Sequence, residues 1–577
     1  MKQYYFFFLF LFAALLLVYY PSLNHGFTFL DDQVQVVENT SIITLDVEHL
    51  QQIFSSTSVG MYQPITTLLY AVVYQFSELN PLGYHLISLL FHGINCVLVF
   101  MLLGYFIKNR WTLFILTSIF ALHPMQVESI AWVSAFSNLV FSTFYLLGIL
   151  TYLKFRKSEN LKFYFFTLLF FLFSCLSKST AVTFPIILLL VDFYEVKELK
   201  KIKWLNKLPF LAMSILFGLI TISSRESAGH FSDLSIQFDG FQRIFLIAYS
   251  ILFYPIQFLW PVHLSAFYPY PELTEGILPF QYYAAIAVLA GLVFVVIKYK
   301  SQRMVWFGLL LFLISISLVL QFIPVGNQLT TDRYIYLPML GILIALGAII
   351  KRLENKKYFY FFLIIPVLFA FKSWERSKVW ENDQLIWEDV LRNYPNVAQA
   401  YNNLGSYVLQ ADQKELAGKY FNKAIELKPY YADAYSNRGN FFAQMKDPES
   451  AIRDYTQAIA LRPHADAYFN RANENSKIHD LWGAIDDYRK SIELKPSPDA
   501  YTNKAYAHYK LGQIDKAKAD LKRGVELFPN YDNAYFLYGI IYRKEGNMTL
   551  ACENFRRSHE LGNQKAKFII REYCSNK

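Results

Sequence analysis

Hydrophobic and polar residues divide the chain into two unlike regions. Up to about residue 371 the sequence consists of long apolar runs separated by short polar segments, whereas the remainder reads like an ordinary soluble protein. A helix needs about 20 predominantly apolar residues to cross a bilayer. The pattern therefore predicts an all-α protein with a polytopic membrane region followed by a soluble helical region.

The apolar runs predict eleven membrane spans. Two further stretches, 64–79 and 241–260, are interrupted by proline or polar residues and are interpreted as interfacial or re-entrant. The first run follows Met1-Lys2-Gln3 and lacks a small-x-small cleavage site, so it is interpreted as an uncleaved first span. The predicted spans are 4–20, 84–107, 112–122, 136–155, 161–176, 180–196, 207–224, 280–299, 304–323, 335–350 and 358–371.

Basic residues give these spans an orientation. With eleven spans and an inside N-terminus, every basic cluster falls in an even-numbered, cytoplasmic loop, as the positive-inside rule requires. Counting either ambiguous stretch as a span would invert the predicted orientation of every later span and loop. The clustered residues are Lys108, Arg110, Lys154, Arg156, Lys157, Lys162, Lys197, Lys200, Lys201, Lys203, Lys207, Lys298, Lys300, Arg303, Lys351, Arg352, Lys356 and Lys357.

The opposite side is acidic. Residues 21–63 contain five Asp or Glu residues and no Lys or Arg, and the few cations facing that way are Lys178, Arg225, Arg243 and Arg333. The C-terminal region then falls on the non-cytoplasmic side of the membrane, which is the inner membrane if the protein is bacterial.

A repeat begins at residue 398. Tyr401, Tyr435, Tyr468, Tyr501 and Tyr535 recur at intervals of 34, 33, 33 and 34 residues, and alanines, aromatic residues and prolines keep the same register. This period is typical of the tetratricopeptide repeat (TPR), a helix pair that stacks into a solenoid. We expect a membrane domain over 1–372, a connecting helix over 373–397 and five repeats over 398–577. Such a solenoid presents a concave surface to extended peptides or partner proteins, or serves as a spacer.

Composition excludes several functions. The chain has 54% hydrophobic and 17% charged residues, and its net charge of +9 comes largely from loops between spans, so no nucleic-acid partner is expected. No P-loop or GxGxxG pattern indicates nucleotide chemistry. The four cysteines have no metal spacing and imply no disulfide framework. A Cys552–Cys574 bridge is compatible with the sequence, but the pattern does not support it.

Polar motifs collect on the acidic side of the predicted membrane region. Asp31 and Asp32 follow the first span, His123 and Glu128 the third, Lys178 joins the fifth and sixth, and Asp332, Arg333 and Tyr334 precede the tenth. Each alone fits an ordinary cap, anchor or solvated loop. Together they suit the transfer of a group from a lipid-linked phosphate. A carboxylate would deprotonate the acceptor hydroxyl, and the cations would hold the leaving phosphate.

These motifs, in order, resemble those of the transmembrane-and-TPR O-mannosyltransferase family. The resemblance rests on the acidic pair, on Met61-Tyr-Gln-Pro64-Ile-Thr-Thr, on Leu122-His123-Pro124-Met-Gln-Val-Glu128-Ser, on Leu176-Ser-Lys178-Ser and on Asp332-Arg333-Tyr334-Ile-Tyr336-Leu-Pro338. It implies a GT-C-type membrane fold and inverting transfer of mannose or another hexose from a polyprenyl- or dolichyl-phosphate donor to protein hydroxyls. The acceptors would be proteins recruited by the repeats.

The resemblance also implies residue roles. Asp31 or Asp32 would be the catalytic base, Lys178 and Arg333 would contact the donor phosphate, and His123, Glu128, Asp332 and Tyr334 would shape the site. No metal ligand is assigned, and dependence on a divalent metal stays open. Residues 136–138 are neutral, where relatives are expected to carry a charge.

Two alternatives remain. The same chemistry serves transfer to a lipid or polysaccharide acceptor, and a membrane-anchored TPR scaffold would need no chemistry at all. A transporter is disfavoured because ionisable residues are nearly absent from the spans and gather at one surface.

Overall fold

The computed structural model describes residues 4–196, 203–227, 238–298, 302–322, 326, 328–351 and 362–574. It divides into two compact units, residues 1–395 and 396–577. Both are helical, as predicted, and extended pairing within the described residues is limited to isolated bridges such as Tyr268–Thr330.

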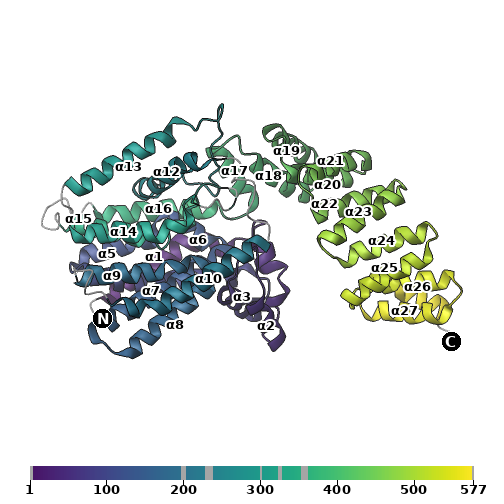
Figure 1. Cartoon of the computed structure of the whole chain (residues 1–577), viewed down its shortest axis with the longest axis horizontal. Helices are drawn as coiled ribbons and strands as arrows, with labels where there is room; N and C mark the ends of the chain where they lie inside the picture. Colours follow the sequence, from purple (N-terminus) through teal and green to yellow (C-terminus); the bar gives the residue numbers. More distant parts are fainter. Residues whose placement is uncertain are drawn as a thin grey trace. The chain divides into compact units, whose positions relative to one another are not determined.

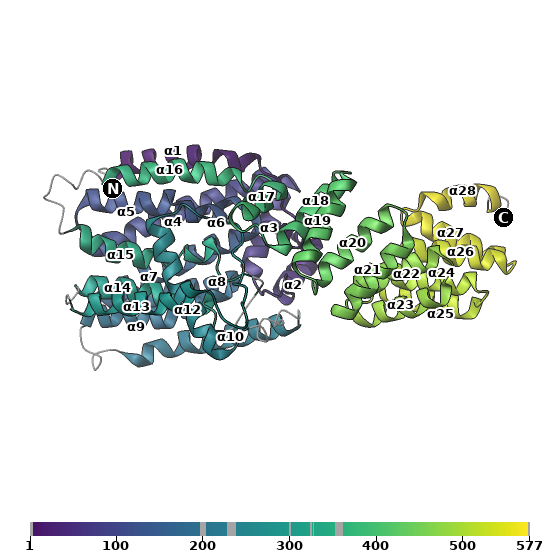
Figure 2. The ribbon, with the colours of Figure 1, turned by 90° about the horizontal axis from the view of Figure 1, so that it is seen from above.

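The first unit is a bundle whose long helices run side by side (Figures 1 and 2). Helix α16, near the end of the unit, packs beside α1 and α5. The helices are α1 (Tyr5–Tyr19), α2 (Val47–Ser55), α3 (Pro64–Ser77), α4 (Pro81–Phe106), α5 (Arg110–Leu122), α6 (Val127–Ala131), α7 (Phe136–Ser158), α8 (Leu161–Ser177), α9 (Phe184–Val196), α10 (Leu208–Ser227), α12 (Gly240–Leu259), α13 (Phe280–Lys298), α14 (Arg303–Ile316), α15 (Met339–Ile350), α16 (Ile364–Lys378) and α17 (Asp383–Asn393).

Seven helical segments among the described residues are long and apolar enough to cross a membrane, or eight if the bent pair α5 and α6 forms one span. Shorter apolar helices cover the predicted spans at 161–176, 304–323 and 335–350. Residues 299, 323 and 358–361 of the predicted spans lie outside the described residues. So do the basic loop residues Lys197, Lys200, Lys201, Lys300, Arg352, Lys356 and Lys357.

Helix α12 covers the ambiguous stretch 241–260, and it is long and apolar enough to count as a span. At its N-terminus Gln242 donates to the carbonyl of Gly276, just before α13, and near its C-terminus the carbonyl of Phe258 accepts a bond from His123 at 3.0 Å. Pro64–Ser77, the other ambiguous stretch, is a helix of only 14 residues.

Small residues allow two membrane helices to pack at very close range. A Cβ on Gly308 of α14 would lie 2.4 Å from the carbonyl oxygen of Gly341 of α15, and the reverse contact is equally short. Helices in lipid lack a hydrophobic driving force toward each other, so close backbone packing of this kind is a principal source of their association.

The predicted connecting helix over 373–397 is two helices. Helix α16 begins at Ile364 and ends at Lys378, and α17 follows at Asp383–Asn393. Both belong to the first unit, and the buried pair of Arg376 and Asp389 joins them at 2.5 Å.

The second unit consists of five helix pairs and a terminal helix, in agreement with the five predicted repeats. The predicted alanines, such as Ala417, are fully buried, and the aromatic residue four positions later fills the space between helices. A Cβ on Gly405 would meet the Phe421 ring at 2.7 Å, so the small residue is required there. The helices are α18 (Ala398–Gln410), α19 (Lys414–Leu427), α20 (Ala432–Gln444), α21 (Pro448–Leu461), α22 (Ala465–Lys477), α23 (Leu481–Leu494), α24 (Pro498–Lys510), α25 (Ile514–Leu527), α26 (Asp532–Lys544), α27 (Met548–Glu560) and α28 (Gln564–Tyr573).

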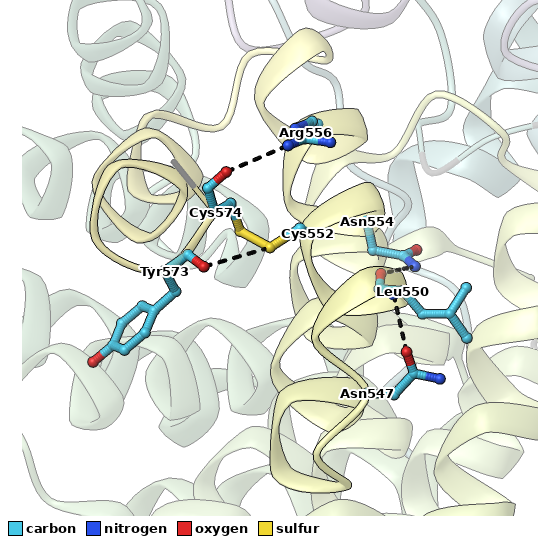
Figure 3. Close-up of a disulfide and its surroundings, with 7 residues drawn as sticks. All are labelled: Asn547, Leu550, Cys552, Asn554, Arg556, Tyr573 and Cys574. Atoms are coloured by element: carbon cyan, nitrogen blue, oxygen red, sulfur yellow. Dashed lines mark hydrogen bonds between the residues drawn. A yellow bond between two sulfur atoms is a disulfide. The ribbon is translucent and has the colours of Figure 1, made fainter. Parts of the chain in front are cut away.

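A disulfide between Cys552 and Cys574 ties the end of α28 to α27 (Figure 3), a pairing that the sequence allows but its pattern does not indicate. The two residues are 22 positions apart and their Cα atoms lie 5.6 Å apart. Sequence spacing alone could not reveal the pair, because the turn that brings α28 back onto α27 sets this distance. Cys96 and Cys175 are buried free thiols.

We expect Cys552→Ser to loosen α28, because the bridge restricts the unfolded chain over 22 residues. Closing a loop of this size stabilises a fold by roughly 3 kcal/mol. Hydrogen exchange of residues 564–574 should accelerate in the variant and, equally, in the reduced wild-type protein. Unchanged protection of α28 after reduction would show that packing alone holds this helix.

Candidate functional site

The acidic pair after α1 contains two carboxylates in different surroundings. Asp32 is fully buried and accepts four hydrogen bonds. The backbone N–H and hydroxyl of Thr28 donate to Oδ2 at 2.9 Å each, and the backbone N–H and hydroxyl of Ser134 donate to Oδ1 at 2.8 and 2.5 Å. Burial raises the pKa of Asp32, whereas these bonds lower it. Asp32 therefore anchors the first loop to the junction of α6 and α7.

Asp31 is only partly buried, whereas Asp32 is fully buried. Its negative charge acts on Arg333, whose pKa it helps to raise. The adjacent anchor at Asp32 fixes the backbone from which Asp31 projects. Of the two carboxylates, Asp31 is the one that a substrate hydroxyl could approach.

Glu128 and Arg333 form a buried ion pair across 205 residues of sequence. The backbone N–H of Arg333 donates to Glu128 Oε2 at 2.7 Å, and its guanidinium donates to Oε1. The guanidinium also lies 5.0 Å from the Trp132 ring centre and 5.1 Å from that of Tyr334, within the range of cation–π attraction. Arg333 is thus held in a fixed place while its side chain stays partly exposed.

Lys178 lies in the turn between α8 and the following 3-10 helix, and it donates to the side-chain oxygen of Asn138 at 2.5 Å. Burial first, and then the positive charges of Arg333 and Arg225, lower the pKa of Lys178 to about 7, while the charge of Glu128 opposes the shift. Two other cations, Arg225 of α10 and Arg333, therefore act on Lys178. Such a group attracts an anion, and binding one would relieve their mutual repulsion.

The remaining predicted site residues have contacts within the fold. Asp332 is buried and accepts a bond from the Tyr268 hydroxyl at 2.7 Å; burial first and the charge of Glu128 second raise its pKa. His123 uses both ring nitrogens within the fold, since Nδ1 accepts from the Met125 N–H and Nε2 donates to the Phe258 carbonyl. Tyr334 flanks the Arg333 guanidinium.

Several residues of this region were not singled out from the sequence as site residues. They are Thr28, Ser134, Asn138, Arg225 and Tyr268, and four of them are neutral polar residues with no spacing that distinguishes them from others. Asn138 lies in the neutral stretch 136–138. The partner that it offers Lys178 is a neutral side-chain amide rather than a charged group. Arg225 carried a signal, as a cation against the charge bias of its side, but no motif surrounded it.

Another anchor comes from α17. The carboxylate of Asp383 accepts the backbone N–H of Phe29 at 3.0 and 2.9 Å from its two oxygens, and burial raises its pKa to about 6. The loop that carries Asp31 is therefore held on one side by Ser134 and on the other by α17. Among the described residues no group of three or more His, Cys, Asp or Glu side chains is arranged to hold a metal ion.

The chain thus combines a membrane-type helical domain that carries a carboxylate-and-cation site with a TPR solenoid. The family model described as "Tetratricopeptide repeat" matches residues 432–464 and 498–531, and a second model of the same description matches residues 385–432. The C-terminal repeats predicted from the sequence are thereby confirmed.

Curated relatives of the chain are named protein O-mannosyl-transferases. The Caenorhabditis elegans protein O-mannosyl-transferase F38B6.6 is 23% identical over 444 residues, which are 72% of this chain and 62% of that protein. The mouse protein O-mannosyl-transferase TMTC3 is 24% identical over 474 residues, 71% of this chain and 50% of that protein. The predicted resemblance is confirmed at this level, and the chain spans about half to three-fifths of these relatives.

Similar solved structures include the MamA protein, with 22% identity and a TM-score of 0.27; the match covers 30% of this chain and 94% of MamA. The TPR protein YrrB has 17% identity and a TM-score of 0.29, covering 32% of this chain and 97% of YrrB.

We expect Asp32→Ala to destabilise the first unit. The change leaves the buried N–H groups of Thr28 and Ser134 without an acceptor, and each such loss costs about 1–3 kcal/mol. The free energy of unfolding should fall by roughly 3 kcal/mol, measured as a lower melting temperature in detergent. Asp31→Ala is the matched control: a partly exposed carboxylate contributes about 1 kcal/mol or less. Equal melting temperatures for the two variants would contradict the anchoring role of Asp32.

Proposed function

We propose that this protein is a membrane glycosyltransferase that transfers mannose or another hexose from a polyprenyl- or dolichyl-phosphate donor to serine or threonine hydroxyls of proteins. The observation that carries the proposal is the partly exposed residue Asp31, whose charge acts on Arg333, together with Lys178, on which the charges of Arg333 and Arg225 act. The relatives named protein O-mannosyl-transferases support the same reaction.

In the proposed reaction Asp31 accepts the proton of the acceptor hydroxyl as its oxygen attacks the anomeric carbon. The bond from that carbon to the phosphate oxygen breaks, and the phosphate leaves with the bonding electrons. Lys178, Arg225 and Arg333 stabilise the negative charge that develops on the phosphate, which is the largest electrostatic demand of this step. Attack opposite the leaving group inverts the anomeric configuration, as expected of a GT-C-type enzyme.

The fixed geometry of the cations supports this assignment. Arg333 is held by Glu128 and two aromatic rings, and Lys178 by Asn138, so both are oriented before a donor binds. Cationic side chains that already point to where negative charge develops need no reorganisation during the reaction. The apolar helices around the site would accommodate the lipid of the donor.

We further propose that the site and the repeats lie on the non-cytoplasmic side. The basic loops support this orientation through the positive-inside rule. The disulfide between Cys552 and Cys574 supports it independently, because disulfides persist in oxidising compartments such as the periplasm or a secretory lumen. The repeats would then recruit protein acceptors on the side where Asp31 acts.

Asp31→Asn should reduce kcat by roughly 10²–10⁴-fold, because the amide cannot accept the hydroxyl proton. The assay uses the full chain in liposomes with polyprenyl-phosphate mannose and a serine- and threonine-containing peptide, and mass spectrometry detects the added hexose. Donor KM and melting temperature should change little.

Glu38→Gln, in the same loop but exposed, is the control and should retain wild-type kcat. Normal kcat in Asp31→Asn would refute the proposed base. Sugar transferred to lipid with none on peptide would select a lipid or polysaccharide acceptor, and transfer to neither would select the scaffold.

The affinity for donor should depend on pH through Lys178. With a pKa of about 7, the unliganded lysine is charged below pH 7 and loses its charge as pH rises, whereas a bound phosphate favours the charged form. Donor KM should therefore be constant below pH 7 and rise by up to about tenfold per pH unit above it. Lys178→Arg keeps the charge at all these pH values. A KM profile in Lys178→Arg as steep as that of the wild type would exclude this lysine as the titrating group.

A further inference from the structure

Helix α3 presents three buried polar side chains along one face. Gln63 lies at its N-cap, and Thr66 and Tyr70 follow three and seven positions later, a spacing that places side chains on the same side of an α-helix. At 14 residues, α3 is shorter than a membrane span. The proposed reaction gives none of these three residues a role, so their burial needs another explanation.

The first of these side chains contacts the loop of the proposed base. Nε2 of Gln63 donates to Oε1 of Gln35 at 3.1 Å, and Gln35 is itself buried. The backbone N–H of Gln35 donates to the Asp31 carbonyl at 2.9 Å, at the start of the short helix Gln33–Val37. The Gln63 amide is therefore bonded to a residue one helical turn from Asp31.

The second side chain contacts the turn that carries Lys178. The Thr66 hydroxyl donates at 3.0 Å to the carbonyl of Ser177, the last residue of α8. The last carbonyls of a helix have no partner within that helix, and this one has its partner in α3. The adjacent Thr67 donates to the Gln63 carbonyl of its own helix at 3.3 Å, as helical threonines commonly do. Thr66 is thus the threonine that joins α3 to α8.

The third side chain contacts the anchor of the acidic pair. The Tyr70 hydroxyl donates at 2.8 Å to the carbonyl of Val133, next to Ser134, which binds Asp32. Burial first, and then nearby charges that include those of Asp32 and Asp31, raise the pKa of Tyr70. The Tyr70 side chain therefore lies within the electrostatic reach of both carboxylates.

One helix thus contacts three segments that carry the site. Seven residues of an α-helix rise about 10 Å, so the contacts at positions 63, 66 and 70 hold these segments at fixed intervals along one axis. Hydrogen bonds inside a helix keep its rise constant, whereas the loop after α1 and the turn after α8 have no regular spacing of their own. The interval between that loop and that turn is then set by α3.

We propose that α3 sets the separation between the proposed base and the donor-phosphate lysine, with Gln63 positioning Asp31 and Thr66 positioning Lys178. Both are positioning residues that act without touching substrate. The attacking hydroxyl and the leaving phosphate lie on opposite sides of the anomeric carbon, so their protein partners must be a fixed distance apart. The catalytic meaning of this separation rests on the proposed function; the link from Thr66 to Lys178 does not.

The link from Thr66 to Lys178 is tested without catalysis. Acetic anhydride acylates the uncharged amine, and mass spectrometry follows the labelling rate of Lys178 in the full-length protein in detergent against pH. The wild-type midpoint should lie near pH 7, set by burial first and then by the charges of Arg333, Glu128 and Arg225. Thr66→Val keeps the shape but removes the hydroxyl, so the turn loosens, the amine gains water, and the midpoint should rise by at least about one pH unit.

Thr67→Val is the matched control, because it removes the neighbouring hydroxyl, which bonds within α3. Thr66→Ser keeps the donor. Both variants should keep the wild-type midpoint. If Thr66→Val does not fold, the smaller Thr66→Ala replaces it. An unchanged midpoint without the Thr66 hydroxyl, or an equal rise in Thr67→Val, would overturn the role of Thr66.

Gln63→Leu tests the role of Gln63 in the sugar-transfer assay. Its kcat should fall by at least about tenfold, because the base is no longer held at reacting distance. Its donor KM and its Lys178 labelling midpoint should match the wild type, since the Thr66 contact remains. Wild-type kcat in Gln63→Leu, or a shifted labelling midpoint, would show that Gln63 does not position Asp31 in this way.

The labelling midpoint separates this inference from the proposed function. Normal transfer by Asp31→Asn would refute the proposed base, yet a raised midpoint in Thr66→Val would still establish that α3 positions Lys178. Loss of transfer in Asp31→Asn together with an unchanged midpoint in Thr66→Val would refute the positioning role of α3 alone.

Discussion

The carboxylate of Asp32 is the contact on which the geometry of the first unit's site depends. A fully buried charge is costly unless its acceptor capacity is used, and four donors from Thr28 and Ser134 use it here. Two of those donors are backbone groups, so the bond fixes the main chain at both ends. The backbone that carries Asp31 is thereby fixed by its neighbour, while Asp31 itself is only partly buried.

Two more buried contacts complete the frame around Asp31. Glu128 joins α6 to the segment of Arg333, and Asp383 joins α17 to Phe29. Each contact pairs a carboxylate with a backbone N–H, which resists displacement better than a bond between two flexible side chains. Three acidic residues of this region, Asp32, Glu128 and Asp383, therefore position the backbone, whereas Asp31 is partly buried and is the proposed base. This division gives adjacent residues of the same type different roles.

The sequence was sufficient for features that follow from local periodicity. The five repeats, their buried alanines and the apolar runs all have a fixed spacing along the chain, and the structure has the corresponding elements. The sequence alone could not tell which of Asp31 and Asp32 is the buried anchor, because the anchoring partner Ser134 lies about one hundred residues away. The pairing of Cys552 with Cys574 was missed for the same reason: it depends on how α28 returns onto α27. Neutral polar residues such as Asn138 carry no pattern of their own.

Length and apolar composition alone would make α12 a span, yet the contacts of the first unit argue otherwise. Arg333 bonds to Glu128, so the two residues lie at the same face of the bundle. The chain between them must then cross an even number of times. Six of the predicted spans lie between them, where the structure has α7, α8, α9, α10, α13 and α14, and Lys178 bonding to Asn138 agrees with the first two. A seventh crossing at α12 would put Arg333 opposite its partner. Proline at position 255 and the bonds at both ends of α12 fit a helix that returns to the face from which it began.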